Sequence, residues 1–491
     1  MLNASGPFSR RVLINPLMDT DSYKLSHHDL YPDDVTVVHS YAESRGGVYP
    51  GSIFFGLQPW VRRMSDTRLT MEMVEQWEEF CHDHGFPVPP SRGARSILER
   101  HDGHLPLLIR SLDEGTWTPV RTPLVTVQNT DDLLGEENMA WLTSYTETSI
   151  LRQTWLGTTI ATRIFGIREK VQFEFEQTAD DLSGLPFAVL DFSSRGVAGF
   201  DHSEIGGAAY LATGFMGSDN VPAVAYTNHY YEDAMSGFSV AATEHSVTTA
   251  WGRDRQKEQF LTALRRTADK FPKGGGILSN VSDTYNVFEM CKLYVECKEE
   301  IEASGVTVVA RPDSGRMVDV LPQCIEILAT GFGTQKNTKG YHVINGVKVL
   351  QGDGINEHTV TEPYILAKEQ GISAQSIMTG SGGGLMMTDL DRDSMKFAFK
   401  ASAVKTARGW QGTAKDPITD AGKRSKAGRF SVYRTGPGRA DIETKIYAGQ
   451  ELIDLSDDAD MLKVRYCNGR LSNQQTLASI RAKVANAVNR F

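Results

Sequence analysis

Short apolar runs rich in β-branched residues recur through the middle of the chain, and several of them end in an acid or a glycine. These runs occupy residues 187–196, 222–228, 276–286, 306–315, 347–354 and 376–384. Helix-like stretches lie between several of them, for example at 255–271 and 318–331. Nearly continuous apolar strands separated by helices predict a parallel sheet that is covered on both faces.

The later runs follow one another at intervals of about 30–40 residues, which is the size of a strand–helix–strand unit. Polar residues stand where these runs end, as they do when the loops at the carboxyl edge of a barrel build a site. We therefore predict an irregular α/β barrel for this part of the chain. The flanks, about residues 1–150 and 386–491, have mixed α+β patterns that include hairpin-like pieces at 116–130 and 428–447.

Composition and charge narrow the class of partner. Of the 491 residues, 40% are hydrophobic, which is ample for a large buried core. The formal net charge of −10 argues against a broad nucleic-acid surface, so we expect no nucleic-acid partner. A small polyanionic substrate remains compatible with this charge, because it needs only a local positive pocket.

Cysteine usage and hydropathy indicate the compartment. The five cysteines form no C-x-x-C pair and have no histidine cluster near them, which favours reduced thiols over disulfides or zinc. Pro16 and Asp19 interrupt the first apolar run before it reaches the length of a signal-peptide core. No stretch approaches the roughly 18 apolar residues of a membrane span. These features predict a soluble cytoplasmic protein with no membrane partner.

The stretch SIMTGSGGG at 376–384 places four glycines in five positions directly after an apolar run. Glycine lets backbone N–H groups approach a phosphate closely, so the loop is a candidate anion cradle. A dinucleotide fingerprint would instead follow the first strand, and no G-K-[ST] marks a Walker loop. In a barrel the loops after the last strands commonly hold a phosphate, and the alternative interpretation is a flexible linker.

Acidic residues follow several of the predicted strands. Asp313 in ARPDSG and Asp353 in QGDG would each stand beside glycine at a strand's carboxyl end. Carboxylates there can accept hydrogen bonds from ribose hydroxyls or hold Mg²⁺ through its waters. Either aspartate alone is most often a turn residue or a helix N-cap, but two of them beside a glycine loop make a stronger pattern. Asp191 and Asp283 extend this ring of acids, with an N-cap as the equal alternative.

Several basic residues lie in or near the same loops of this acidic chain. They are Arg195, Arg311, Lys348, Arg392, Lys400, Lys415 and the run 422–429. Arginine and lysine beside glycine loops are the usual clamp for phosphate oxygens, whereas a charge run more often covers a solvated face. His245 and Phe192, each taken alone, are more often core residues than a catalyst and a stacking platform.

Stretches spread over most of the chain, in one order, resemble the nicotinamide phosphoribosyltransferase family over roughly residues 19–435. They read DTDSYKLSHHDLYP, FFGLQPWV, DGHLPL, DFSSRGV, GSDNV, EHSVTTAWG, VSDTYN, RPDSG, QGDG, GSGGGL and DPITDAGKRSKAGR. The resemblance implies transfer of a phosphoribosyl group from phosphoribosyl pyrophosphate to nicotinamide, with Mg²⁺, in NAD salvage. It also implies a homodimer with shared active sites, in which residues 1–150 and 386–491 form one α+β domain beside a barrel at 151–385.

The resemblance assigns residues to the base and to the sugar phosphate. At nicotinamide it places Phe192, Asp219, Arg311 and Ser239, with Tyr23 and nearby Asp21 of the partner subunit. At the ribose it places Asp313, Gly352 and Asp353. At the 5-phosphate it places Arg195, Gly383 and Gly384, with Arg392 and Lys400 of the partner subunit.

The resemblance also implies a catalytic set of His245, Asp283 and Asp313. ATP phosphorylates the matching histidine in the family and raises catalytic efficiency, so ATP is expected as a coupled substrate. Asp283 is expected near the magnesium pyrophosphate, with Asp353 as a second metal candidate. Lys415 and Lys423 are assigned to the pyrophosphate and ATP side.

Some positions depart from the family pattern. Ser193 and Ser194 stand where Gly-Tyr is frequent, and Ala398 replaces a serine that elsewhere touches phosphate. Phe187 replaces a common tyrosine and lacks its hydroxyl, and Lys348 replaces a common arginine, which exchanges a bidentate clamp for a point charge. These changes leave room for weaker phosphate or ligand binding and do not indicate loss of the reaction.

Asp219 decides between the two nearest functions. A carboxylate accepts a hydrogen bond from an amide NH₂ and repels the carboxylate of nicotinate, so we predict nicotinamide and keep nicotinate phosphoribosyltransferase as the alternative. A barrel aldolase would need a lysine at a strand end, and the predicted strands show none. A non-catalytic binding protein could have lost Asp313, Asp353 or the glycine loop, all of which are present.

Overall fold

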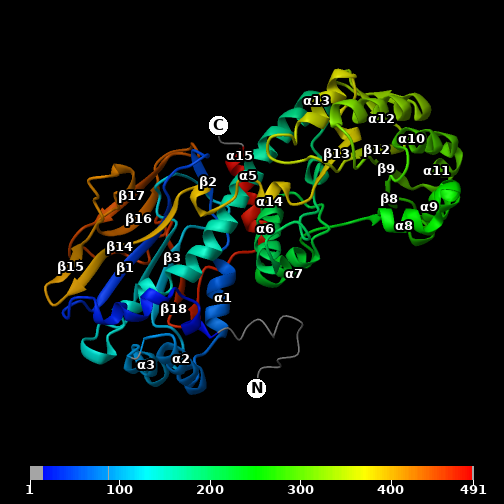
Figure 1. The fold of residues 1–491 in the computed structure, drawn as a ribbon. Coiled ribbons are helices and arrows are strands. Elements are labelled where there is room, and N and C mark those ends of the chain that lie inside the picture. Colours follow the sequence, from blue (N-terminus) through cyan, green and yellow to red (C-terminus); the bar gives the residue numbers. More distant parts are fainter. Residues whose placement is uncertain (1–14, 87, 489–491) are drawn as a thin grey trace. The chain divides into compact units, whose positions relative to one another are not determined.

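The computed structural model describes residues 15–86 and 88–488 (Figure 1). Across these residues the chain forms two compact units. The first, here called the sheet unit, comprises Met1–Thr162, Tyr230–Glu232 and Asp391–Phe491, and the second, the barrel unit, comprises Arg163–His229 and Asp233–Leu390. Helix α5 (Glu147–Thr178) belongs to the first unit at its start and to the second thereafter.

An antiparallel sheet forms the centre of the sheet unit and combines strands from both ends of the chain. In spatial order its strands are β15 (Gly409–Gly412), β14 (Phe397–Thr406), β1 (Val37–Ser44), β5 (Val125–Asn129), β3 (Leu107–Ser111), β18 (Lys463–Cys467) and β19 (Arg470–Leu471). β1 is buried at every position and pairs with β14 from Val37↔Lys405 to Ser44↔Phe397. This long pairing ties the two chain ends into one domain.

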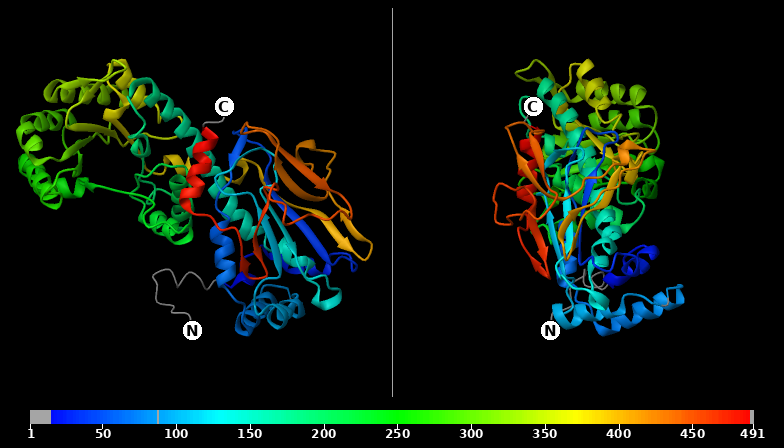
Figure 2. Two further views of the ribbon diagram at one scale, coloured as in Figure 1. Left: turned by 180° about the vertical axis from the view of Figure 1, so that it is seen from behind. Right: turned by 90° about the vertical axis from the view of Figure 1, so that its left-hand side faces the viewer.

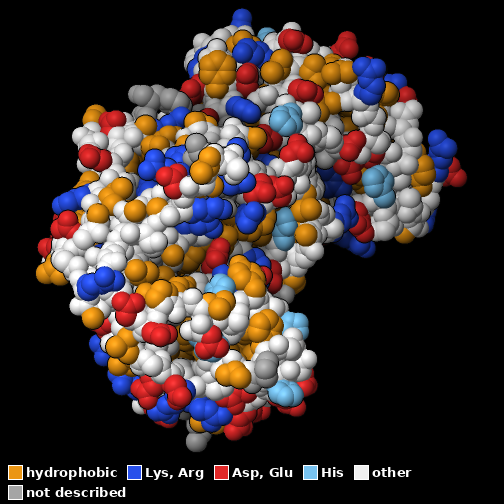
Figure 3. Space-filling view, turned by 60° about the vertical axis from the view of Figure 1, so that its left-hand side comes forward, with side chains coloured by type: hydrophobic (Ala, Val, Ile, Leu, Met, Phe, Trp, Pro, Cys, Tyr) orange, Lys and Arg blue, Asp and Glu red, His pale blue; other side chains and the backbone are white. Residues whose placement is uncertain are grey.

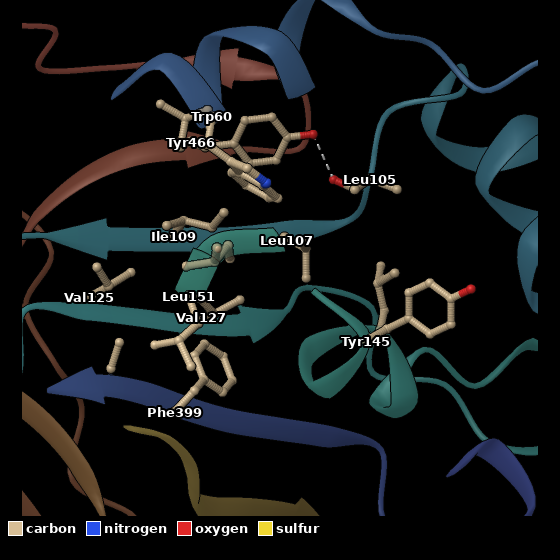
Figure 4. Close-up of a cluster of buried hydrophobic side chains, with 14 of the residues drawn as sticks. Trp60, Leu105, Leu107, Ile109, Val125, Val127, Tyr145, Leu151, Phe399 and Tyr466 are labelled. Carbon is tan, nitrogen blue, oxygen red and sulfur yellow. Dashed lines mark hydrogen bonds between the residues drawn. The ribbon is translucent and has the colours of Figure 1, made fainter. Parts of the chain in front are cut away.

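One face of this sheet carries the core of the unit. Ile109 on β3, Val125 on β5 and Phe399 on β14 are fully buried there or nearly so, and Trp60 of helix α1 (Gln58–Asp66) belongs to the same cluster at its Ile109 end (Figure 4). Tyr466 of β18 is buried in the same cluster, and its hydroxyl donates a hydrogen bond to the Leu105 carbonyl at 3.0 Å. Burying apolar side chains from strands of both chain ends stabilises the pairing described above.

The remaining elements of the sheet unit surround this core. Its other helices are α2 (Met71–Asp83), α3 (Ser91–His101), α4 (Ala140–Tyr145) and α15 (Leu477–Val488), and its 3₁₀ turns are η2 (Pro16–Met18), η3 (Ser22–Asp29), η4 (Gly135–Glu137), η8 (Arg392–Ser394) and η9 (Ala421–Lys423). Two antiparallel pairs complete it, β2 (Gly51–Ile53) with β4 (Trp117–Pro119) and β16 (Arg429–Arg434) with β17 (Ile442–Tyr447).

A curled parallel sheet forms the barrel unit, as the sequence predicts. Its spatial order is β6 (Val189–Asp191), β13 (Ile377–Ser381), β12 (Val347–Gln351), β9 (Thr307–Arg311), β8 (Ile277–Val281) and β7 (Ala241–Ala242). Isolated parallel bridges, Asp191↔Ser218 and Gly217↔Phe238, link the β6 edge to the segment that leads into β7. These bridges replace regular strands at that point, which makes the barrel irregular.

Helices lie outside the curled sheet (Figures 1 and 2). They are α6 (Phe200–Ala212), α7 (Val221–Tyr230), α8 (His245–Trp251), α9 (Gln256–Lys270), α10 (Val287–Glu296), α11 (Lys298–Ser304), α12 (Met317–Phe332), α13 (Glu362–Glu369) and the short α14 (Gly384–Met387). The unit also contains the turns η5 (Leu185–Phe187), η6 (Arg253–Arg255) and η7 (Ala374–Ser376) and the hairpin of β10 (Thr334–Lys336) with β11 (His342–Ile344). Because all strands of the curled sheet are parallel, their carboxyl ends lie at one edge, where a site can form.

Two local predictions are wrong. The apolar run 222–228 is helix α7 rather than a strand, because the Asn220 side chain accepts a hydrogen bond from the Ala223 amide at 3.1 Å and Pro222 stands in the first turn. Residues 116–130 are not a hairpin, because β4 pairs with β2 while β5 pairs with β1 and β3. The hairpin at 428–447 is confirmed as β16 and β17.

The charges on the surface, the state of the cysteines and the helix lengths can be compared with what the composition predicts. Acidic and basic side chains are intermixed over the face shown in Figure 3. The five cysteines are free, and four of them are buried. Within residues 15–86 and 88–488, no helix has both the length and the apolar character needed to cross a membrane.

Candidate active site

A cavity of about 460 Å³ occupies the interior of the barrel unit. Alternate residues of the strands line it, including Ser279 on β8, Val309 and Arg311 on β9, and Lys348 and Leu350 on β12. This alternation follows from the period of two in a β-strand, which sends successive side chains to opposite faces. The inner face of the curled sheet therefore forms a wall of this cavity.

Four of the residues assigned to the base line this cavity together: Phe192, Asp219, Ser239 and Arg311. The Ser239 hydroxyl donates a hydrogen bond of 2.5 Å to Asp219 Oδ1. Arg311 Nη2 donates to the Thr243 carbonyl at 2.6 Å, while its buried Nε has no partner among the described residues. The cavity therefore presents an aromatic face, a carboxylate and a guanidinium at one end.

The Phe192 ring lies directly over the backbone of Gly380. A Cβ atom built on Gly380 would stand 2.2 Å from a ring carbon, so any side chain there would displace the ring. The Phe192 amide also donates to the Ser381 carbonyl at 2.8 Å, which fixes the residue against β13. Gly380 is a candidate site residue that the sequence analysis missed, since only the fold brings it beneath Phe192.

Asp191 holds the segments that carry Phe192 and Asp219 through hydrogen bonds of its side chain and its carbonyl. Its carboxylate is buried and accepts hydrogen bonds from the Ser193 amide at 2.9 Å and the Ser218 hydroxyl at 3.2 Å. Burial raises the pKa of Asp191, and these hydrogen bonds oppose that rise. The Asp191 carbonyl also accepts from the Asp219 amide at 2.9 Å. Asp191 therefore holds the backbone around Phe192 and Asp219 in place, and it is not a helix N-cap, since the next helix begins only at Phe200.

A group of acids lies at the carboxyl ends of β8, β9 and β12. His245 Nε2 is 3.0 Å from Asp283 Oδ1, so the imidazole and this carboxyl group are hydrogen-bonded. Burial raises the pKa of Asp313; the charges of Arg311 and His245 lower it, whereas those of Asp283 and Asp353 raise it further. The structure thus brings the expected catalytic set and Asp353 into one electrostatic neighbourhood.

Gly352 allows the close approach of Asp313 in this group. A Cβ atom on Gly352 would lie 2.6 Å from Asp313 Oδ1. The adjoining Gln351 side chain donates to the Asp353 carbonyl at 2.9 Å. Glycine at 352 therefore leaves the space that the Asp313 carboxylate occupies.

The acid group suits a magnesium ion that also binds substrate. Mg²⁺ is commonly held by one or two carboxylates together with substrate phosphates and waters, and Asp283 and Asp353 offer such oxygens. Among the described residues, no three His, Cys, Asp or Glu side chains are grouped closely enough to hold a metal by themselves. The donor set therefore fits a shared protein–substrate site and not an all-protein cage.

Two glycine loops pack against each other beside this group. A Cβ atom on Gly383 would lie 2.5 Å from the Gly196 carbonyl oxygen, and one on Gly384 would lie 2.5 Å from the Ile355 carbonyl oxygen. The Arg195 side chain is exposed at the edge of the first loop. The close backbone contact excludes the flexible-linker interpretation of 380–384, because side chains could not be accommodated at 383 and 384.

The remaining assigned residues lie in the sheet unit. Tyr23 is 58% exposed, and Asp21 accepts a hydrogen bond from the Thr148 hydroxyl at 2.6 Å. Arg392 is paired with Asp393, and Lys423 with Asp420. Burial lowers the pKa of Lys400; Glu147 raises it, and the cations Arg45, Lys415 and Lys24 lower it further. Lys24 and Arg45 thus join Lys400 and Lys415 in a basic group, although nothing in their sequence spacing connects them.

The departures from the family pattern have local partners. The Ser193 hydroxyl donates to Met386 Sδ at 3.0 Å, and the Ser194 and Ser203 hydroxyl groups are 3.0 Å apart. Phe187 lines the cavity with Phe238, their ring centroids 6.4 Å apart. Lys348 Nζ donates to the Gln375 carbonyl at 2.8 Å. Ala398 stands opposite Glu43 in the pairing of β14 with β1.

A parallel barrel with acids and a glycine loop at its carboxyl edge is the arrangement expected of a phosphoribosyltransferase, and the comparisons with known proteins assign the chain to that class. The family model described as nicotinate phosphoribosyltransferase (NAPRTase) family matches residues 187–470, and that of the nicotinamide phosphoribosyltransferase N-terminal domain matches residues 15–109. The chain belongs to the nicotinate phosphoribosyltransferase family, as a member of the nicotinamide phosphoribosyltransferase type, and is a pentosyltransferase of NAD salvage, which confirms the resemblance seen in the sequence.

Curated relatives and solved structures agree with this assignment. A nicotinamide phosphoribosyltransferase of Xanthomonas campestris pv. campestris is 38% identical over 96% of this chain and 98% of its own, and one of Acinetobacter baylyi is 29% identical over 97% and 98%. The fold is similar to that of a nicotinate-nucleotide pyrophosphorylase from Pyrococcus furiosus, with a TM-score of 0.60, 13% identity and coverage of 100% and 99%. It is also similar to human nicotinic acid phosphoribosyltransferase, with a TM-score of 0.59, 15% identity and coverage of 96% and 93%.

Proposed function

We propose that this enzyme uses nicotinamide as the base and phosphoribosyl pyrophosphate as the donor, and so forms nicotinamide mononucleotide and pyrophosphate. The observation that supports nicotinamide is the exposed Asp219 carboxylate, which lines the cavity beside Ser239 and Phe192. A carboxylate accepts the amide N–H of nicotinamide, whereas nicotinate would place a second negative charge against it. Nicotinate is therefore the disfavoured base.

The base needs orientation more than activation. The pyridine nitrogen of nicotinamide is already a neutral nucleophile, so no general base has to remove a proton from it. Phe192 would stack on the ring, and Asp219 would fix the carboxamide, with Arg311 close to its oxygen. Holding the nitrogen in line with ribose C1 converts a bimolecular encounter into an oriented one.

The charges of the site match the charges that develop during transfer. The bond from ribose C1 to pyrophosphate breaks, its electron pair leaves with pyrophosphate, and positive charge develops on the sugar. Asp313 and Asp353 would stabilise the sugar, while Arg195 and the backbone of Gly383 and Gly384 would hold the 5-phosphate. Mg²⁺ bound by Asp283, Asp353 and the donor would neutralise charge on the leaving group.

ATP is proposed as a coupled substrate that phosphorylates His245. In that step an imidazole nitrogen attacks the γ-phosphorus, and ADP leaves with the electrons of the broken bond. The hydrogen bond from His245 to Asp283 would orient the ring and stabilise its positive charge. Lys415 and Lys423 remain the residues proposed for the pyrophosphate and ATP side.

The assembly and compartment are also proposals. We expect a cytoplasmic homodimer in which the partner subunit supplies Tyr23, Asp21, Arg392 and Lys400 to the barrel of its neighbour. The exposure of Tyr23 and the basic group around Lys400 support this arrangement, because both are suited to meet a ring and a phosphate from outside the sheet unit.

Kinetics with both bases test the assignment. The ratio of kcat/KM for nicotinamide to that for nicotinate should fall about 100-fold in Asp219→Asn, because a like-charge repulsion of several kcal/mol is removed. Asp269→Asn, an equal charge change at an exposed position of α9, should leave the ratio unchanged. Turnover of nicotinate equal to that of nicotinamide in the unmodified enzyme would reject the proposed base.

A further inference from the structure

The barrel cavity extends well below the residues assigned to the base. Arg311 ends β9, whereas Lys348 pairs with Val309 and so lies about two residues, roughly 7 Å, nearer the amino ends of the strands. Thr307, Ile277 and Gln375 line the cavity at this lower level. A cavity of about 460 Å³ is large enough for a drug-sized ligand, so a single pyridine ring leaves its lower part open.

Lys348 brings a primary amine into this lower part. Its side chain is partly buried on the inner face of β12, beside Val309, its partner on β9. The amine donates one hydrogen bond, to the Gln375 carbonyl at 2.8 Å. None of the carboxylates in residues 15–86 and 88–488 forms an ion pair with it.

This environment favours a neutral, nucleophilic amine. A carbonyl oxygen accepts a hydrogen bond from an amine as well as from an ammonium, so the contact with Gln375 does not require the charge. Desolvation lowers the pKa of Lys348, and no neighbouring charge opposes that effect. Arginine at this position could not act in this way, because its guanidinium keeps its proton.

We propose that Lys348 is a covalent binding site for apolar aldehydes inside the barrel, independent of phosphoribosyl transfer. The Nζ lone pair attacks the aldehyde carbon, and the carbonyl oxygen takes up a proton to give a carbinolamine. Loss of that hydroxyl group as water, together with the remaining nitrogen proton, leaves a C=N bond. The reaction needs no oxidant or reductant and is reversible by water. An apolar body fits the surrounding wall of Val309, Leu350 and Ile377.

Reductive trapping tests this site in the full-length protein. The protein is incubated at pH 7 with benzaldehyde and cyanoborohydride, and the benzylated lysines are ranked by peptide mass spectrometry. Lys348 should be modified faster than the exposed Lys270 of α9, because desolvation lowers the pKa of Lys348 and leaves a larger fraction of its amine neutral. Glyceraldehyde, which is polar and gains nothing from the apolar wall, should show a smaller preference.

The lysine that is benzylated in the wild-type protein decides whether the proposal holds, so the test does not depend on the folding of any variant. Lys348→Arg should abolish the fast adduct and leave that on Lys270 unchanged, while the matched Lys270→Arg should keep the fast adduct. Modification of Lys348 no faster than that of Lys270, or an equal preference with glyceraldehyde, would overturn the proposal. Because nothing here depends on turnover, a failed transfer reaction would be a separate result.

Discussion

The position of the Phe192 ring depends on a residue that has no side chain. Gly380 lies beneath the ring, and a methyl group there would overlap it. Gly382, two residues further along the chain and just after β13, has open space around it. The two glycines look equivalent in the sequence, yet only the first supports the proposed base site.

Gly380→Ala should therefore weaken base binding selectively. The displaced ring loses its stacking geometry, and we expect KM for nicotinamide to rise about tenfold or more, which corresponds to an aromatic contact of about 1.5 kcal/mol. KM for phosphoribosyl pyrophosphate should change much less. Steady-state kinetics of Gly382→Ala provide the matched control, and equal effects of the two substitutions would contradict the account.

His245 lends itself to a second test at this scale. Its Nε2 is hydrogen-bonded to Asp283, which suits a phosphorylated imidazole. His245→Gln should remove the gain in kcat/KM that ATP gives, because glutamine cannot form the phosphoramidate. The rate without ATP is measured in parallel for each protein. A variant that keeps the full stimulation by ATP would show that His245 is not the phosphorylated group.

At the scale of elements, the pairing of β1 with β14 contains a buried histidine. His39 of β1 has its Nδ1 3.1 Å from the Ser402 hydroxyl of β14. Burial, with the charges of Arg110 and Arg429, lowers the pKa of His39 from 6.5 to about 3. The folded state therefore binds this proton more weakly than the unfolded state does. The contribution of neutral His39 to the free energy of unfolding is therefore fully present above about pH 6.5, and it is lost as the pH falls from there toward 3.

Acid should thus destabilise the central sheet through His39. Between pH 7.5 and 5.0 the sheet should lose about 2 kcal/mol on account of this residue, and His39→Gln should not show that loss. Hydrogen exchange of the β1 and β14 amides, corrected for intrinsic rates, gives the free energy of opening at each pH. His82→Gln, at an exposed position of α2, is the control. Equal losses in the unmodified protein and in His39→Gln would refute this role.

The barrel strands were predictable from sequence, and other elements were not. Runs such as 306–315 and 347–354 are apolar because both faces of a parallel strand are covered, so periodicity and their terminal acids suffice to identify them. The run at 222–228 has the same composition, but it begins with a proline just after an asparagine cap, and these two residues direct it into α7. Residues 116–130 look like a hairpin because partners far away in the sequence cannot be read locally.

At the scale of the whole molecule, the sequence predicts that polar residues meet at one edge of the barrel but not how they are spaced. That Asp283, Asp313, Asp353 and His245 influence one another follows from strand order, which places β8, β9 and β12 side by side. The sheet unit is harder to predict, since β1 and β14 are more than three hundred residues apart in the chain and their pairing leaves no local signal.

The proposed sharing of active sites in a homodimer predicts complementation between two inactive subunits. Tyr23→Ala alters the sheet unit, and Asp313→Asn alters the barrel unit, so a mixed dimer would contain one site with both intact residues. Random mixing gives about half mixed dimers with one working site each, and thus about a quarter of normal activity. Each variant alone should be much less active. No recovery after unfolding and joint refolding, with mixed dimers verified by mass, would argue against sharing.

Formation of the mononucleotide tests the central claim most directly. The protein is incubated with nicotinamide, phosphoribosyl pyrophosphate and Mg²⁺, with and without ATP, and the products are separated and identified by mass. We predict nicotinamide mononucleotide and pyrophosphate in equal amounts, formed faster with ATP. Absence of the mononucleotide with and without ATP would contradict the account. So would a mononucleotide that forms only when nicotinate replaces nicotinamide.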